Sequence, residues 1–230
     1  MSSGLIDWNL LAEIVAVPAM SQPAMWDAFA RKYNGYARLE EDYTRLQIEA
    51  MRLESQDTLL DIGFGPGRIA VPAAPRVKAV TALDTSRLML DELERNVREA
   101  GAANVHALHL PWDEVVPGEN VDIHDVVVAS RSPAMKDLAK IDAMARKFVY
   151  VMTFAGPSLK SFHDTLVSGT ELAPPPSNPI RSPFKGNTLL YNRIADMGVE
   201  VNVFHVPDGF TKRYPSRDAA NADFDWLTAP

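Results

Sequence analysis

The sequence predicts an α/β protein built as three layers, with helices on both faces of a mostly parallel sheet. Short apolar runs typical of buried parallel strands alternate along the chain with amphipathic stretches typical of helices. One run, 58–62, leads into a glycine-rich turn, and the next, 79–83, ends in an acid, Asp84. The succession of strand, glycine turn, helix, strand and acid is typical of a βαβ unit that binds a nucleoside.

Size and composition limit the classes of protein to consider. A chain of 230 residues suits one α/β domain with a sizeable core, and its 47% hydrophobic and 23% charged residues are ordinary for a globular protein. The formal charge of −7 and the lack of a long basic run argue against a dedicated nucleic-acid binder. No cysteine is present, which excludes disulfides and thiolate metal sites and fits a cytoplasmic protein. No segment has the pattern of a signal peptide or a membrane span, so no membrane association is expected.

Three amphipathic stretches precede the first strand. Residues 5–17, 24–33 and 38–53 place apolar side chains at helical spacing, and two prolines separate the first stretch from the second. We therefore predict an N-terminal helical cap over 1–55 and assign 56–230 to the main domain.

The glycine turn indicates which nucleoside to expect. Its spacing is Gly63-x-Gly65-x-Gly67, whereas dinucleotide enzymes use G-x-G-x-x-G. Glycines leave no Cβ in the way, so a ligand can lie directly on the backbone, and a helix beginning just beyond would offer unpaired N–H groups. Asp61 precedes the first glycine by two residues. A carboxylate there would repel a pyrophosphate but suits a cationic ligand with a free amine.

At this point the stretch LLDIGFGPG resembles the first motif, roughly D-x-G-x-G-x-G, of the class I S-adenosylmethionine-dependent methyltransferases. The resemblance implies a Rossmann-like sheet, S-adenosylmethionine as cofactor and S-adenosylhomocysteine as product. It also implies that Asp61 and the glycine turn hold the methionine part of the cofactor, while Asp84 accepts the ribose hydroxyls. The alternative is a tight turn between strand and helix that binds nothing.

The same resemblance gives a role to the second helical stretch. Many small-molecule methyltransferases place a similar W-D-x-x-A-x-x-Y stretch across the mouth of the cofactor site, which would make Trp26, Phe29 and Tyr33 part of a cap. The alternative is that Trp26 and Phe29 simply pack the helix onto the sheet. We favour that alternative for Trp26, because apolar stripes on helices usually serve the core.

The third strand is expected at 104–110, after a helix that ends at Gly101. In the resembling family the loop that follows this strand holds the adenine, which points to Trp112 as a stacking face and Asp113 as an acceptor. Asp113 could equally cap the next turn. The implied cofactor set is Asp61, Gly63, Gly65, Gly67, Asp84, Thr85, Trp112, Asp113 and Ser130.

The fourth strand is expected at 121–129, and its loop reads Ser130-Arg131-Ser132-Pro133. Doubly wound folds place ligands at this edge of the sheet. The loop departs from the N-P-P-Y motif of the methylases that act on amino groups of DNA and protein, so those substrates lose support. A helix at 134–146 and a fifth strand at 147–154 are expected next.

Residues 155–186 are rich in proline, serine and glycine, and we predict a lid or substrate loop there. Charged or polar side chains in it are candidate substrate contacts, with ordinary surface charges as the alternative reading of each: Lys160, His163, Asp164, Arg181 and Lys185. No catalytic residue is assigned and no metal site is expected. His163 is the histidine best placed to act as a base, whereas His109 and His124 lie in strands and are expected to be structural.

The remaining chain raises a difficulty. A helix at 188–197, an alternating strand at 199–206 and a last helix from Ser216 to about residue 227 are predicted, which makes six strands. The resembling fold usually has seven. The protein is a shortened variant, the sequence is truncated, or a partner chain supplies the strand, and we favour a distorted sheet or a homo-oligomer.

The function predicted is methyl transfer to a small-molecule acceptor by direct in-line displacement. A tRNA or protein methyltransferase is the alternative within the class. A dinucleotide-dependent oxidoreductase is opposed by the glycine spacing and by Asp61. A catalytically silent nucleoside-binding module is the third alternative, because a fold can outlive its function.

Overall fold

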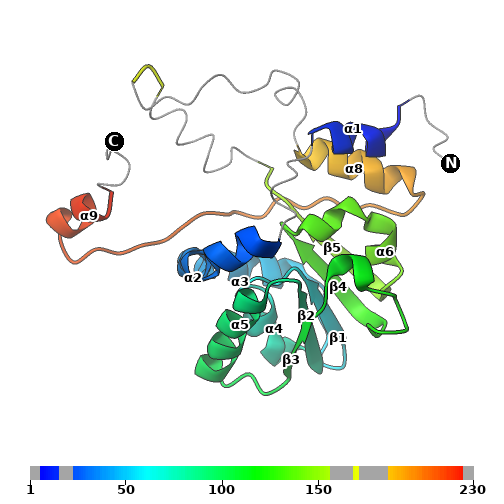
Figure 1. Cartoon of the computed structure of the whole chain (residues 1–230), viewed down its shortest axis with the longest axis horizontal. Coiled ribbons are helices and arrows are strands. Elements are labelled where there is room, and N and C mark those ends of the chain that lie inside the picture. Colours follow the sequence, from blue (N-terminus) through cyan, green and yellow to red (C-terminus); the bar gives the residue numbers. More distant parts are fainter. Residues whose placement is uncertain (1–5, 16–22, 156–167, 171–185, 225–230) are drawn as a thin grey trace.

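The computed structural model describes residues 6–15, 23–155, 168–170 and 186–224. Five parallel strands form one sheet in the order β3-β2-β1-β4-β5 (Figure 1). Their bounds are β1 Thr58–Ile62, β2 Ala79–Asp84, β3 Val105–His109, β4 His124–Ser130 and β5 Ala145–Met152. The predicted α/β class and the positions of these five strands are confirmed.

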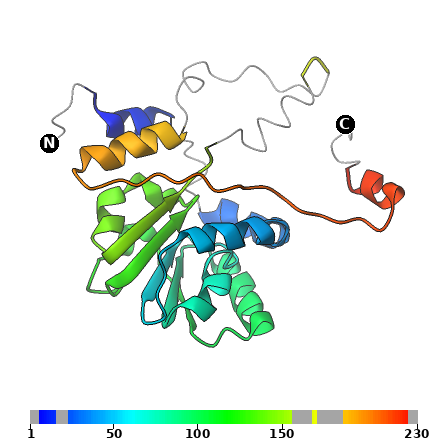
Figure 2. The ribbon, with the colours of Figure 1, turned by 180° about the vertical axis from the view of Figure 1, so that it is seen from behind.

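Helices cover both faces of this sheet, as Figure 2 shows from behind. One face packs against α2 (Pro23–Leu39), α3 (Glu41–Ala50), α4 (Ala70–Ala73) and α5 (Arg87–Ala100), and the other against α6 (Leu138–Asp142). Successive side chains of a strand point to opposite faces of the sheet. Leu59 therefore packs in the core on the α2–α5 face, and Leu60 packs in the core on the α6 face. Neither side chain is exposed, which is why apolar residues at consecutive positions dominate the central strands.

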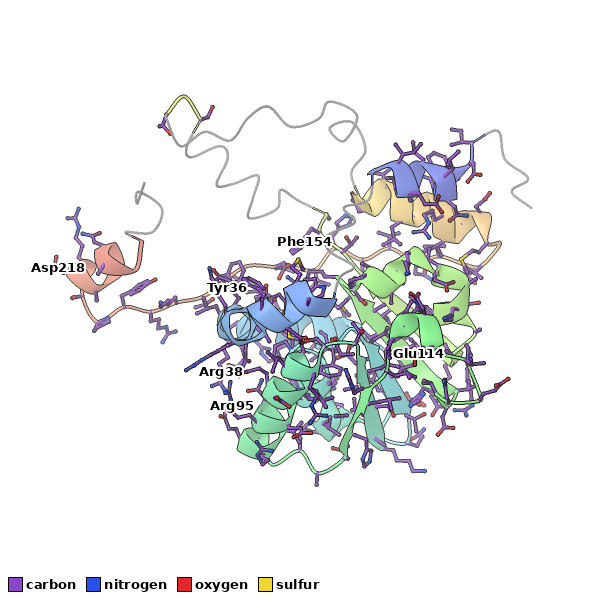
Figure 3. The ribbon with its side chains drawn as sticks, viewed as in Figure 1. Tyr36, Arg38, Arg95, Glu114, Phe154 and Asp218 are labelled. Atoms are coloured by element: carbon purple, nitrogen blue, oxygen red, sulfur yellow. The ribbon has the colours of Figure 1, made fainter. Side chains whose placement is uncertain are left out.

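The start of α5 shows how the helices are tied to the strand ends. Ser86 is its N-cap, and the hydroxyl accepts a hydrogen bond from Met89 N at 3.1 Å. The same hydroxyl donates to Asp27 Oδ1 of α2 at 2.5 Å. The helix ends at Gly101, whose φ of 65° suits a residue without a Cβ. Farther along, Arg38 of α2 donates to Glu99 of α5 (Figure 3).

Two predicted helices differ from the structure. The helix after the glycine turn is a single turn, Ala70–Ala73, followed by the 3-10 turn η2 (Ala74–Arg76), because Pro72 and Pro75 interrupt the stretch. The helix predicted at 134–146 is divided into η4 (Pro133–Lys136) and α6, and Ala145 already belongs to β5.

The strand predicted at 199–206 is wrong, because these residues form no ladder with any strand. Val203 and Phe204 are 58% and 63% exposed. Residues 199–206 instead belong to the longer connection between α8 (Gly186–Asp196) and α9 (Arg217–Phe224). Thr211 N in this connection donates a hydrogen bond to Leu39 O at the end of α2. Among the described residues nothing pairs with the outer edge of β5.

The first helix is separate from the other two predicted with it. α1 (Trp8–Val15) lies beside α8 in both views, whereas α2 packs on α5 and α3 on α4 (Figures 1 and 2). The division into a cap at 1–55 and a main domain stays a prediction. Within the described ranges, no helix combines the length and apolar character needed to cross a bilayer.

The two hydrogen bonds of the Ser86 hydroxyl give a first prediction. Ser86→Ala removes the helix cap and the partner of Asp27, so the free energy of unfolding should fall by about 1–2 kcal/mol. Ser216→Ala removes the exposed cap of the peripheral α9 and should cost less than about 0.5 kcal/mol. Urea unfolding followed by circular dichroism measures both, and equal losses would contradict this account.

Candidate functional site

A cavity of about 350 Å³ opens at the carboxyl edge of the sheet, at the ends of β1, β2, β3 and β4. This is the size of ordinary small-molecule sites. Its walls come from the glycine turn, the loops after the next two strands, the loop after β4 and helix α2. The lining residues are Trp26, Tyr33, Ile62, Gly63, Gly65, Leu83, Asp84, Thr85, Met89, Leu110, Pro111, Trp112, Asp113, Ser130, Arg131, Ser132, Pro133, Ala134 and Lys136.

The structure brings most of the predicted site residues together in this cavity. Seven of them line it, namely Gly63, Gly65, Asp84, Thr85, Trp112, Asp113 and Ser130. Asp61 and Gly67 do not line it. They lie behind the wall, where both are buried.

Asp84 is held by the backbone around it. Its Oδ2 accepts from Gly65 N at 3.1 Å and its Oδ1 from Ser86 N at 2.9 Å. Burial raises the pKa of this carboxyl, although the hydrogen bonds from Ser86, Gly65 and Thr85 oppose the shift. A carboxylate has about four acceptor positions, so Asp84 can still accept hydroxyl groups from a ligand in the cavity.

Asp61 lies beneath the turn and is 1% exposed. Its Oδ2 accepts from Ala70 N at 3.0 Å, so the first N–H of α4 is already satisfied. Burial raises the pKa of Asp61 from 3.8 to about 7, against the opposing attraction of Arg68. The carboxylate therefore acts on the turn from behind, and a direct contact with a ligand amine stays a prediction.

The glycines of the turn are required by protein contacts as well as by conformation. A Cβ on Gly63 would stand 2.3 Å from Ser132 Oγ, and one on Gly67 would stand 2.4 Å from Leu93 Cδ1. At Gly65 the nearest atom is Tyr33 Cε1 at 3.2 Å. All three glycines also have positive φ. Both the backbone conformation and the lack of space for a Cβ therefore favour glycine at these positions.

Trp112 and Asp113 occupy η3 (Trp112–Glu114), directly after β3. The indole Nε1 of Trp112 is buried and has no hydrogen-bond partner among the described residues, so it is a donor available to a ligand. Lys140 Nζ lies 4.9 Å from its ring centroid and donates to its carbonyl. Asp113 is 83% exposed and pairs with Lys136 at 3.1 Å. The two residues thus offer a buried face and a solvated acid.

Helix α2 forms a roof over the cavity. Trp26 and Tyr33 line it, with their ring centroids 6.0 Å apart in an edge-to-face arrangement, and Phe29 does not line it. Trp26 also packs against the core beneath. Trp26 therefore contacts both the core and the cavity, and its part in a cap over a cofactor stays a prediction.

A buried network of charges was not predicted from the sequence. Arg131, in the loop after β4, forms a bidentate ion pair with Glu40. Its Nη1 lies 2.9 Å from Glu40 Oε1, and its Nη2 lies 2.6 Å from Glu40 Oε2. Arg68 follows the glycine turn and lies 3.5 Å from the same carboxylate. Its guanidinium also donates to Thr44, Gln47 and Ser130. Glu40 is distant in the chain from both Arg68 and Arg131, and no pattern in the sequence indicates that the three meet.

Other predicted candidates lie elsewhere. Lys160, His163, Asp164, Arg181 and Lys185 fall outside the described residues. His109 contacts Thr85 O at 3.1 Å, and His124 is buried between Thr81 Oγ1 and Asp122 O. Burial lowers the pKa of His124. Both histidines are satisfied by protein partners, as expected of structural residues.

Comparison with known proteins agrees with this description. Residues 59–156 match the family model described as a methyltransferase domain, which confirms the resemblance seen in the glycine motif. An uncharacterized protein of Haemophilus influenzae is 37% identical over 108 residues, which is 45% of this chain and 40% of that protein. The chain thus spans less than half the length of this curated relative.

Solved structures resemble the chain more distantly. A methyltransferase from Thiobacillus denitrificans, in complex with S-adenosyl-L-homocysteine, is 16% identical with a TM-score of 0.48 over 56% of this chain and 55% of that chain. The DhpI–SAH complex is 19% identical with a TM-score of 0.47 over 57% of this chain and 66% of that chain.

The contact of Gly63 with Ser132 gives a second prediction. Gly63→Ala forces a Cβ into the serine side chain at a positive φ, so the free energy of unfolding should fall by about 2–4 kcal/mol. Gly101→Ala has a similar φ but open space around it, so it should cost only about 1 kcal/mol. Chemical unfolding compares the two, and a Gly63→Ala loss no greater than that of Gly101→Ala would refute the role of the contact.

The raised pKa of Asp61 gives a third prediction. The unfolded carboxyl ionises near 3.8 and the folded one near 7, so only the folded protein holds the proton between those values. Stability therefore falls as pH rises through this window. Asp61→Asn keeps an acceptor for Ala70 N without titrating. The free energy of unfolding of the wild type relative to Asp61→Asn should fall by about 2–4 kcal/mol from about pH 4 to about pH 7.5. A constant difference in urea titrations would disprove the shift.

Proposed function

Because residues 59–156 match the family model of a methyltransferase domain, we propose that this protein is an S-adenosylmethionine-dependent methyltransferase whose acceptor is a small molecule. The observation that carries the proposal is the juxtaposition of the glycine turn and the Asp84 carboxylate on one wall of the cavity. That arrangement suits a nucleoside, whose sugar hydroxyls are donors for a carboxylate and whose chain can lie along a backbone free of Cβ atoms.

The residues present fit this cofactor. Asp84 keeps acceptor positions for two ribose hydroxyls, and the buried, unpaired Nε1 of Trp112 is a donor that a ligand would satisfy. Thr85 and Asp113 lie on the same wall and are proposed to contact the adenine. Gly63 and Gly65 are proposed to accept the methionine part, with Asp61 and Gly67 holding the turn from behind.

The chain's own contribution to the reaction is alignment and exclusion of water. The cofactor supplies a methyl group that the positive sulfur already activates. Trp26 and Tyr33 close one side of the cavity, while Ser130 and its loop form the opposite wall, beside the cofactor half. Holding the two reactants in line in a dry site can supply much of the rate enhancement without an acid or a base.

A small acceptor is favoured over a macromolecule by the form of the cavity and by charge. Trp26 and Tyr33 cover the site, and the protein carries a formal charge of −7, which opposes binding to a polyanion such as tRNA. A protein acceptor and a catalytically silent module remain the alternatives, and turnover with a panel of metabolites separates them from this proposal.

The cofactor proposal gives a fourth prediction. S-adenosylhomocysteine should bind to the wild type in isothermal titration calorimetry, and NAD should not. Asp84→Asn should weaken the binding about tenfold to a hundredfold, because a charged acceptor of the ribose hydroxyls is lost. Glu114→Gln, which changes an exposed acid in the same 3-10 turn as Trp112, should leave the affinity within about twofold. Unchanged affinity in Asp84→Asn, or preference for NAD, would refute the proposal.

A further inference from the structure

Charged residues divide the cavity into two halves of opposite sign. The wall at the ends of β2 and β3 carries the acids Asp84 and Asp113. The wall after β4 carries the bases Arg131 and Lys136, and no acid lines that half. The two acids lie in the half that we assign to the cofactor. The acceptor would therefore lie next to the basic half.

Arg131 is held in one orientation at this wall. Both nitrogens at the end of its guanidinium donate to Glu40, and the group lies 4.8 Å from the ring centroid of Phe154, just beyond β5 (Figure 3). Its φ of 54° is a left-handed conformation that a residue with a Cβ seldom adopts. The backbone is thus strained at a residue that lines the cavity. Strain of this kind gathers at functional sites.

Arg131 is the member of this buried charge network that lines the cavity. Arg68 and Arg131 share the single carboxylate of Glu40, and all three side chains are at most 15% exposed. Asp61 and Asp208 also attract these arginines, and like Glu40 and Arg68 they do not line the cavity. A guanidinium has five N–H donors, and the pair with Glu40 leaves part of the fork of Arg131 for another anion.

We propose that the methyl acceptor is a small organic anion, and that Arg131 selects it by binding its carboxylate or other acidic group at the wall after β4. This inference rests on the proposed function and names the substrate class of the same site. Lys136 lies at the rim, paired with Asp113 in solvent, and adds a weaker attraction. Arg131 is a specificity-determining residue, and methyl transfer itself needs no group from it.

A purely structural role is the rival account of the same contacts. In that account Arg131 only joins the start of α3 to the loop after β4 through Glu40. The two accounts differ in what the cavity prefers to bind. A structural clamp gives the site no preference between an acid and its neutral isostere, whereas a selecting guanidinium does.

The experiment uses the full chain loaded with S-adenosylhomocysteine and a panel of small carboxylic acids, each matched with its primary amide. Ligand-observed NMR and competition measure the affinities. The acids should bind at least about tenfold more tightly than the amides, because only the acids form charge-assisted bonds with Arg131. Equal affinity for acids and amides in the wild type would overturn the proposal without any variant.

Variants then locate the preference. Arg131→Gln should abolish the preference for acids, Arg131→Lys should retain part of it, and Arg76→Gln, an exposed arginine at the other edge of the sheet, should leave it unchanged. Binding of S-adenosylhomocysteine shows whether each variant is folded. A preference that survives in a folded Arg131→Gln would overturn the role of Arg131. Failure of the wild type to bind S-adenosylhomocysteine would refute the proposed function instead.

Discussion

The hydrogen bond from Gly65 N to Asp84 Oδ2 is the contact around which the cavity is built. It joins the turn after β1 to the end of β2, so two neighbouring strands present their ends as one wall. Since Asp84 is 8% exposed, the bond lies in a poorly solvated place, where an unpaired carboxylate would be costly. The carboxylate is thereby held in one position and remains able to accept from a ligand.

Asp61 and the arginines form a second set of charges behind and beside this wall. Asp61 accepts a hydrogen bond from Ala70 N beneath the turn. Arg68, which follows the turn, pairs with Glu40 and donates to Ser130. Glu40 lies at the junction of α2 and α3, so this network joins the end of α2 to the loop after β4.

Local sequence signals predicted the structure correctly where a position requires a particular backbone conformation that few residue types adopt. Gly101 ends α5 in a left-handed conformation, as the pattern indicated. The signal failed at 199–206, where alternating apolar and polar residues predicted a strand. Alternation makes a segment suited to a sheet, but a strand exists only where a neighbour accepts its hydrogen bonds, and here none does.

The sequence by itself determined the α/β class, the order of strand, glycine turn, helix and acid, and the side of the sheet on which a ligand would lie. These follow from periodicity and from backbone conformations that few residues adopt, so they can be read within short windows. Only the tertiary structure decided that Asp61 lies behind the turn, that Ser132 requires a glycine at position 63, and that Arg68 and Arg131 share Glu40. Burial and charge pairing join residues distant in the chain, and no local pattern records which of them meet.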